Sequence, residues 1–88
     1  MPTERAQWPH TVADIIKSLD GIWGLVGATA TSGNLLRLER SLNEPTTYTI
    51  TEYEGDNEAS VINKSTYQAG EKAQAVTEFA RQLGFSDN

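Results

Sequence analysis

Hydrophobic residues near the start of the chain recur at the spacing of an α-helix. Four of them follow the i, i+3, i+4, i+7 pattern, namely Val12, Ile15, Ile16 and Leu19. This pattern predicts a helix over residues 11–19 with one apolar face. Thr11 and Asp14 have the spacing of a capping box, and Gly21 follows as a helix stop. Trp8, just before Pro9, is expected to pack on this helix.

After Gly21 the hydrophobic period changes to two, which predicts a β-hairpin of strands 22–30 and 35–42 around the turn "TSGN". Two registers are open, because a slip of one residue exchanges the faces of a strand. With a loop of two or four residues, the face of Leu36, Leu38 and Leu42 also carries Trp23, Leu25, Gly27 and Thr29. With a loop of three, that face carries Val26, Ala28 and Ala30 instead. The first register buries more apolar area, and we expect it.

Two further strands are predicted on the same grounds. Residues 46–53, "TTYTITEY", have high β-propensity, with Tyr48 and Ile50 on one face. The other face carries Thr47, Thr49, Thr51 and Tyr53. A turn signal at 55–57 separates this strand from a second one over 59–65, in which Val61 is expected to contact Ile50.

The last segment, 69–85, returns to the helical period. Its apolar positions are Ala73, Val76, Phe79, Ala80 and Leu83, and Gly84 followed by Phe85 is typical of a helix C-terminus. The predicted fold class is therefore α+β: an N-terminal helix, a four-stranded antiparallel meander and a C-terminal helix, with both helices on one face of the sheet. We expect one domain over 1–88, with flexible ends at 1–7 and 86–88.

Composition narrows the class of protein. The chain has 88 residues, no cysteine and a net charge of −5. A small domain without disulfides is typical of the cytoplasm, and no apolar run resembles a signal peptide or a membrane span. The acidic balance disfavours direct binding to nucleic acid. We therefore expect a cytoplasmic protein that binds neither nucleic acid nor membrane.

The glycine-rich stretch 21–34 does not have the spacing of a nucleotide-binding loop. Gly27 is followed by five residues before Gly33, and Asn34 stands where a phosphate loop has lysine. His10 is the only histidine, and no serine lies in a nucleophile-elbow pattern. We expect His10 to be an exposed residue, and we expect neither an enzyme nor a cofactor.

Acidic residues are concentrated in one segment. Residues 41–63 contain five acids and neither Lys nor Arg, whereas the rest of the chain balances at seven acids to seven bases. Threonines and one tyrosine of the third strand form a partly apolar strip beside these acids, and tyrosine is a common interface anchor. The expected partner-binding residues are Glu44, Thr49, Thr51, Glu52, Tyr53, Glu54, Asp56 and Glu58.

Calcium is an alternative for this acidic run, but the pattern departs from that of a calcium loop. In an EF-hand loop starting at Glu52, Asn57 and Asn63 stand where glycine and a bidentate glutamate are needed. No metal ligand is therefore assigned, and a solvated turn that protects a sheet edge is the plainer interpretation.

These observations favour a small acidic protein that binds other proteins. The leading hypothesis is an inhibitor or antagonist that covers a basic, often nucleic-acid-binding, surface of a larger protein. Phage anti-defence proteins, other mobile-element proteins and toxin-immunity proteins follow this physical plan. One alternative is an accessory or structural subunit that forms a homodimer or joins a complex through its sheet. A second alternative is a metal-dependent module that uses the acidic hairpin.

Overall fold

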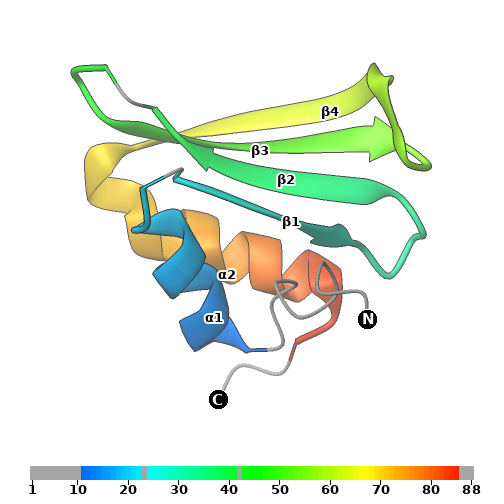
Figure 1. Ribbon diagram of the computed structural model, residues 1–88, viewed down its shortest axis with the longest axis horizontal. Helices are drawn as coiled ribbons and strands as arrows, with labels where there is room; N and C mark the ends of the chain where they lie inside the picture. The colour runs from blue at the N-terminus through cyan, green and yellow to red at the C-terminus, as the bar shows by residue number, and fades with distance from the viewer. Residues whose placement is uncertain (1–10, 23, 42, 86–88) are drawn as a thin grey trace.

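Two helices cover one face of a four-stranded antiparallel sheet (Figure 1). This computed structural model describes residues 11–22, 24–41 and 43–85. The elements in chain order are α1 (Val12–Leu19), β1 (Leu25–Thr29), β2 (Leu35–Arg40), β3 (Thr47–Glu54), β4 (Asn57–Gln68), the 3₁₀ turn η2 (Ala69–Glu71) and α2 (Lys72–Leu83). Strand order in the sheet follows chain order, so the predicted α+β meander is confirmed.

The predicted start of α1 is confirmed. The Oγ1 atom of Thr11 accepts a hydrogen bond from the backbone N–H of Asp14 at 3.1 Å, which satisfies one donor of the first turn. Ile15 and Leu19 are fully buried against the sheet, whereas Ile16 is exposed. The helix thus buries a narrower stripe than its apolar pattern predicts. Trp8 and His10 lie outside the described residues.

The predicted end of α2 is also confirmed. Gly84 has a φ of +85°, and the N–H of Phe85 donates to the carbonyl of Ala80 at 3.0 Å. This left-handed cap lets the chain leave the helix while satisfying a terminal carbonyl. Ala73, predicted on the apolar face, is exposed; Ala75 is buried in its place. The predicted positions Val76, Phe79 and Ala80 are buried, so the rest of the apolar face is as expected.

The register expected for the first hairpin is wrong. Val26 lies opposite Leu38, and Ala28 lies opposite Leu36, so these residues share the buried face while Leu25 is exposed. The loop has three residues, because the N–H of Ala30 donates to the carbonyl of Asn34 at 2.8 Å.

Two physical causes favour the three-residue loop. Gly33, with a φ of +94°, supplies the left-handed residue that such a loop requires. The small side chains of Val26 and Ala30 also lie in the same core cluster as Ile15 and Leu19, so they allow α1 to pack closely on the sheet. Trp23 and Leu42, which belonged to the expected register, lie outside the described residues.

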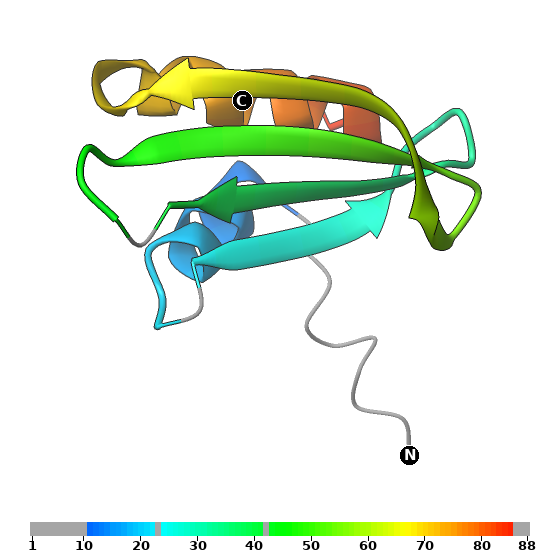
Figure 2. The same cartoon turned by 90° about the horizontal axis from the view of Figure 1, so that it is seen from above.

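The pairing of β3 with β4 differs from prediction at one end. Tyr48 and Ile50 are buried in the core as expected. However, Ser65 lies opposite Ile50, and Val61 lies opposite Tyr53 on the other face. The register shifts on both sides of Tyr53, and the first part of β4 turns across the ends of β3 and β2 (Figure 2). The predicted contact between Val61 and Ile50 is therefore absent from this hairpin.

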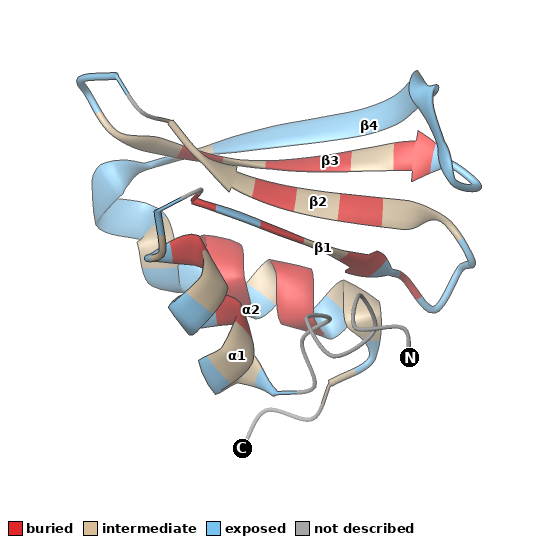
Figure 3. Ribbon diagram, in the orientation of Figure 1, coloured by how far each residue is buried: buried red, intermediate tan, exposed pale blue. Residues whose placement is uncertain are grey.

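Burial is concentrated between the helices and the inner strands. Figure 3 shows buried residues on α1, α2 and β1 to β3, whereas β4 is exposed along most of its length. Because β4 is an edge strand, one of its sides has no neighbouring strand. Among the described residues, no helix is long and apolar enough to cross a membrane.

Candidate functional site

The turn between β3 and β4 carries three exposed acidic residues. Glu54 ends β3, Asp56 follows Gly55 in the turn, and Glu58 lies near the start of β4. Gly55 has a φ of +58°, which lets the chain reverse within two residues. We call Glu54, Asp56 and Glu58 the acidic tip. It lies at one end of the sheet, where the ribbon is exposed (Figure 3).

Arg37 of β2 connects the acidic tip with the open face, the sheet face without helices. Its Nη1 atom lies 3.5 Å from Oε1 of Glu58, and its guanidinium carbon lies 5.3 Å from the centroid of the Tyr53 ring. Since β3 separates β2 from β4, this ion pair crosses the open face above Tyr53. Tyr53 is only 3% exposed. Residues of its own chain cover the ring that the sequence predicts as an interface anchor.

The Arg37 guanidinium balances part of the acidic charge. Its Nε atom is buried without a hydrogen-bond partner among the described residues, and Oε2 of Glu39 lies 3.9 Å away. That distance allows electrostatic attraction but not a hydrogen bond. Glu58 is therefore partly neutralised by Arg37, which leaves Glu54 and Asp56 as the acids of the tip without a cationic neighbour among the described residues.

The threonine strip does not form one exposed surface. Thr51 is only 4% exposed. Thr49 is half-buried, and its Oγ1 atom lies 3.4 Å from Oγ1 of Thr66 on β4. These hydroxyl groups lie along the β3–β4 pair, where cross-strand contacts stabilise a sheet. The structure therefore gives Thr49 and Thr51 a packing role on the open face.

Glu52 lies on the helix side of the sheet and joins two turns. Its Oε2 atom accepts a hydrogen bond from Nδ2 of Asn34 at 2.8 Å, and Oδ1 of Asn34 accepts one from the N–H of Gly55 at 3.0 Å. The N–H of Leu35 also donates to the carbonyl of Gly55 at 2.7 Å. Asn34 thus holds the β3–β4 turn against the β1–β2 turn. Sequence reasoning treated Asn34 only as a turn residue and Glu52 only as an exposed acid.

Glu44 is separated from the other predicted site residues. It lies in the loop before β3, whereas the acidic tip follows the end of β3. Figure 1 shows these two loops at opposite ends of the sheet. Glu44 is exposed, but a partner on the acidic tip would have to span the length of β3 to reach it. The predicted set is thus divided among the tip, the open face, the helix side and a distant loop.

Two exposed aliphatic side chains lie on β4 beyond the acidic tip. Val61 is 52% exposed and Ile62 is 53% exposed. Sequence reasoning missed Ile62 and placed Val61 in the core, because strict alternation along β4 hides the register shift beside Tyr53. The β3–β4 hairpin therefore combines exposed carboxylates with exposed apolar surface.

No family model matches the chain, and no curated protein or solved structure matches it. Among the described residues, no three His, Cys, Asp or Glu side chains lie together in a way that could hold a metal ion. The interpretation of the site therefore depends on the chemistry of this chain alone.

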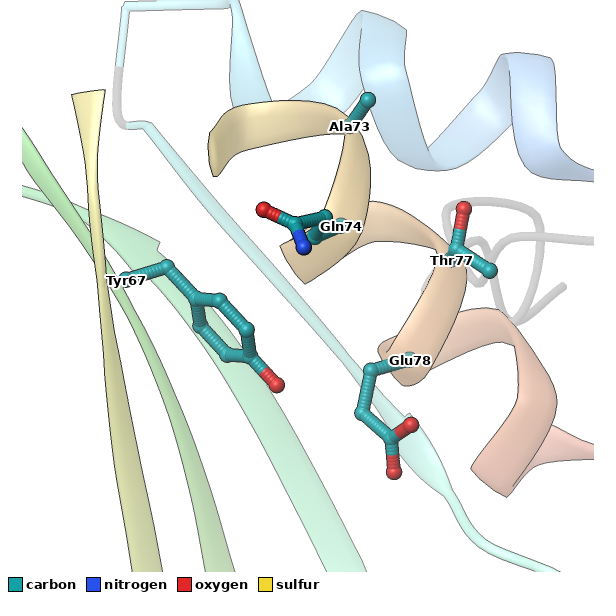
Figure 4. A pocket seen from close by; sticks show the side chains of 5 residues that line it. All are labelled: Tyr67, Ala73, Gln74, Thr77 and Glu78. Carbon is teal, nitrogen blue, oxygen red and sulfur yellow. The ribbon is translucent and has the colours of Figure 1, made fainter. Parts of the chain in front are cut away.

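A second surface feature is an open groove between β4 and α2 (Figure 4). It has a volume of about 400 Å³ and is lined by Tyr67, Ala73, Gln74, Thr77 and Glu78. In Figure 4 the Tyr67 ring from β4 faces the side chains of Gln74 and Glu78 from α2. The groove thus brings together the aromatic ring of Tyr67, the amide of Gln74 and the carboxylate of Glu78.

The Glu78 carboxylate at this groove is held in its ionised form. It accepts hydrogen bonds from Arg81 and from Gln82, one turn further along α2. The hydrogen bond from Arg81 contributes most to lowering the pKa of Glu78, followed by that from Gln82, while burial opposes the shift. Glu78 is consequently ionised at neutral pH, and its ion pair with Arg81 balances part of its charge.

Proposed function

We propose that this chain is a small cytoplasmic, non-enzymatic protein that binds another protein, acting as an inhibitor or antagonist of a partner with a basic surface. The supporting observation is the β3–β4 hairpin, which carries the acidic tip at its turn and the exposed side chains of Val61 and Ile62 a few residues further along β4. Apolar groups next to a charged rim are the usual anatomy of a protein–protein interface.

Electrostatics support a basic partner. The whole net charge of −5 can be assigned to residues 41–63. Opposite charge on a partner would speed encounter and orient the two surfaces. Basic clefts that hold DNA or RNA are common surfaces of this kind, so an antagonist of a nucleic-acid-binding protein fits the charge distribution.

Binding through the tip can be tested by charge reversal. The chain serves as bait in an extract of cells that produce it, and captured proteins are identified by mass spectrometry. Asp56→Lys is compared with Glu44→Lys, because both acids are exposed and lie at opposite ends of the sheet. We expect Asp56→Lys to weaken capture of a basic partner by about fivefold or more, and Glu44→Lys to leave it within about twofold.

Equal capture by the two variants would contradict the proposal, as would a set of captured proteins without a basic surface. Salt dependence gives a second readout. Because rim charges act mainly on association, the wild-type association rate should fall with increasing salt more steeply than that of Asp56→Lys. A rate that is independent of salt in both proteins would also count against an electrostatic interface.

A further inference from the structure

The helix layer extends past the sheet at the β4 edge. Viewed from above, α2 is visible beyond the outer side of β4 (Figure 2). The groove lined by Tyr67, Gln74 and Glu78 lies in this position. Asn63 and Ser65, which lie opposite Glu52 and Ile50 on the helix side of β4, are exposed. The groove, with its volume of about 400 Å³, is consequently the open space between β4 and α2 that a further segment could use.

The direction of the β4 backbone groups follows from the pairing of the inner strands. The N–H of Ser41 donates to the carbonyl of Thr47 at 2.8 Å, so the odd-numbered residues at the start of β3 bond to β2. Antiparallel strands alternate the side to which they bond, so Ile50 of β3 bonds to Ser65 of β4. On β4, Lys64, Thr66 and Gln68 therefore direct their backbone groups away from the sheet.

Two of these three outward N–H groups are already occupied. The N–H of Lys64 donates to Oδ1 of Asn63 at 2.9 Å, and that of Gln68 donates to Oε1 of Glu71 at 2.9 Å. Among the described residues, no side chain caps the N–H of Thr66. The edge is thus open to a new strand over a short stretch centred on Thr66.

The open stretch lies next to the groove. Thr66 points its side chain to the open face, whereas its neighbour Tyr67 points to the helix side. In a strand paired with Thr66, the residues that flank the paired position would point toward α2, because successive side chains alternate. They would enter the hollow between the Tyr67 ring and the Glu78 carboxylate. A ring face with a carboxylate is suited to a lysine or arginine side chain.

We propose that a short extended segment of a basic partner pairs with β4 at Thr66 and places a Lys or Arg side chain between Tyr67 and Glu78. This inference rests on the proposed function, since it specifies how the basic partner is held. The Glu78 carboxylate has lone pairs beyond those used by Arg81 and Gln82, so it accepts one more donor. A second copy is a poorer occupant, because each copy carries a charge of −5.

A peptide selection tests this mode without knowledge of the natural partner. A phage-displayed library of random short peptides is panned against the folded chain, and an enriched peptide is synthesised. We expect enriched peptides to alternate β-branched residues with Lys or Arg. Thr66→Pro removes the outward N–H at an edge position, where proline is tolerated, and should weaken peptide binding by about tenfold. Thr66→Val keeps the N–H, loses the same hydroxyl and should bind within about twofold.

The contact between Glu78 and the basic side chain of the peptide can be tested by a double-mutant cycle. Glu78→Gln should weaken a peptide that carries lysine by about threefold to tenfold and should leave the same peptide with lysine replaced by methionine unchanged. Equal binding to Thr66→Pro and Thr66→Val overturns the inference, as does a selection that enriches no peptide above the naive library. Concentration-dependent dimers that Thr66→Pro abolishes would identify a second copy as the occupant and overturn it as well.

A measurement on the unchanged chain covers the case in which Thr66→Pro does not fold. In an NMR titration with the enriched peptide, the N–H of Thr66 should become protected from exchange, and the resonances of Tyr67, Gln74 and Glu78 should shift. Shifts confined to Glu54, Asp56 and Glu58 would overturn strand pairing at Thr66 while supporting the tip as a binding surface. The two proposals therefore fail separately.

Discussion

The Nη1 atom of Arg40 donates a hydrogen bond to the carbonyl oxygen of Leu19, 2.9 Å away. Nη2 of the same side chain donates to the carbonyl of Gly21 at 3.2 Å. The last carbonyls of a helix have no partner within the helix, and the helix dipole favours a cation near them. Arg40, at the end of β2, therefore caps the C-terminus of α1 and links the helix to the sheet.

Replacing Arg40 with methionine should destabilise the protein by about 1–2 kcal/mol, because two partly buried carbonyl groups lose their donors. Urea unfolding followed by circular dichroism measures this change. Arg81→Met removes an exposed arginine whose ion pair lies within one helix turn, and it should destabilise the protein clearly less than the change at Arg40. A similar loss for the two variants would contradict the capping role of Arg40.

Gly24→Ala should destabilise the protein by about 1–3 kcal/mol. Gly24 has a φ of +60°, and a Cβ atom there would lie 3.2 Å from Cζ, Nε and Nη2 of Arg40. Gly70→Ala is the matched control, since a Cβ at Gly70 meets nothing within 4 Å. Thermal unfolding of the two variants should separate them, and a melting temperature for Gly24→Ala equal to that of Gly70→Ala would show that neither strain nor crowding acts at Gly24.

The register of the first hairpin can be checked by shortening neighbouring side chains. Val26 is 4% exposed and Leu25 is 39% exposed. We expect Val26→Ala to cost about 2 kcal/mol in unfolding free energy and Leu25→Ala to cost less than about 1 kcal/mol, although leucine loses the larger group. Chemical denaturation gives both values. The opposite order would support the register with Leu25 in the core.

Asn34→Asp should place two carboxylates beside each other where Asn34 now donates to Glu52 at 2.8 Å. The lost donor and the like charge should cost about 1–3 kcal/mol at neutral pH. Adding Glu52→Gln restores a neutral partner that can donate, so the double variant should recover part of that loss. Additive effects of the two changes in a double-mutant cycle would show that the residues do not interact.

The pH dependence of stability should report the Glu78 carboxylate. Its pKa is lowered in the folded chain from an ordinary value of 4.5. A lowered folded-state pKa gives stability that is present above pH 4.5 and is lost as the pH falls through the folded value. The wild type should thus be more stable than Glu78→Ala at neutral pH by only about 0.5 kcal/mol, because solvent screens this ion pair, and the difference should shrink below pH 4.5. Urea unfolding at several pH values measures it, and a constant difference would contradict the lowered pKa.

Local patterns in the sequence predicted the elements and their order in the sheet, but not the register in which neighbouring strands pair. The helical period around Ile15 and Phe79 and the strand period around Ile50 each follow from neighbours a few residues away, so they can be read from the chain itself. The hairpin register depends on one loop residue, Gly33, and on how closely α1 packs over Val26. Buried apolar area alone favoured the face of β1 that carries Leu25. That criterion takes no account of the space that α1 needs to pack on the sheet.

The sequence predicted which acidic residues are exposed at the candidate site, but not how the neighbouring side chains pack. The exposed acids of the tip follow from charge clustering along residues 52–58. The burial of Tyr53 could not be predicted from the sequence, because it depends on the register shift in β4 and on the ion pair that Arg37 forms with Glu58 across β3. The position of Arg37 between two core leucines of β2 could have indicated this contact. A charged residue at such a position lies on the open face, where a nearby acid can pair with it.

The side-chain caps on β4 also bear on how copies of this chain behave when concentrated. Fibrils grow when edge strands offer an uninterrupted row of amide donors to identical strands. Here the side chains of Asn63 and Glu71 accept hydrogen bonds from the amides of Lys64 and Gln68, on either side of Thr66. Between them, in the part of the chain that the structure describes, only the amide of Thr66 is left as a donor for another strand. An edge of this kind can accept one short, matched segment and yet resist stacking into a growing array.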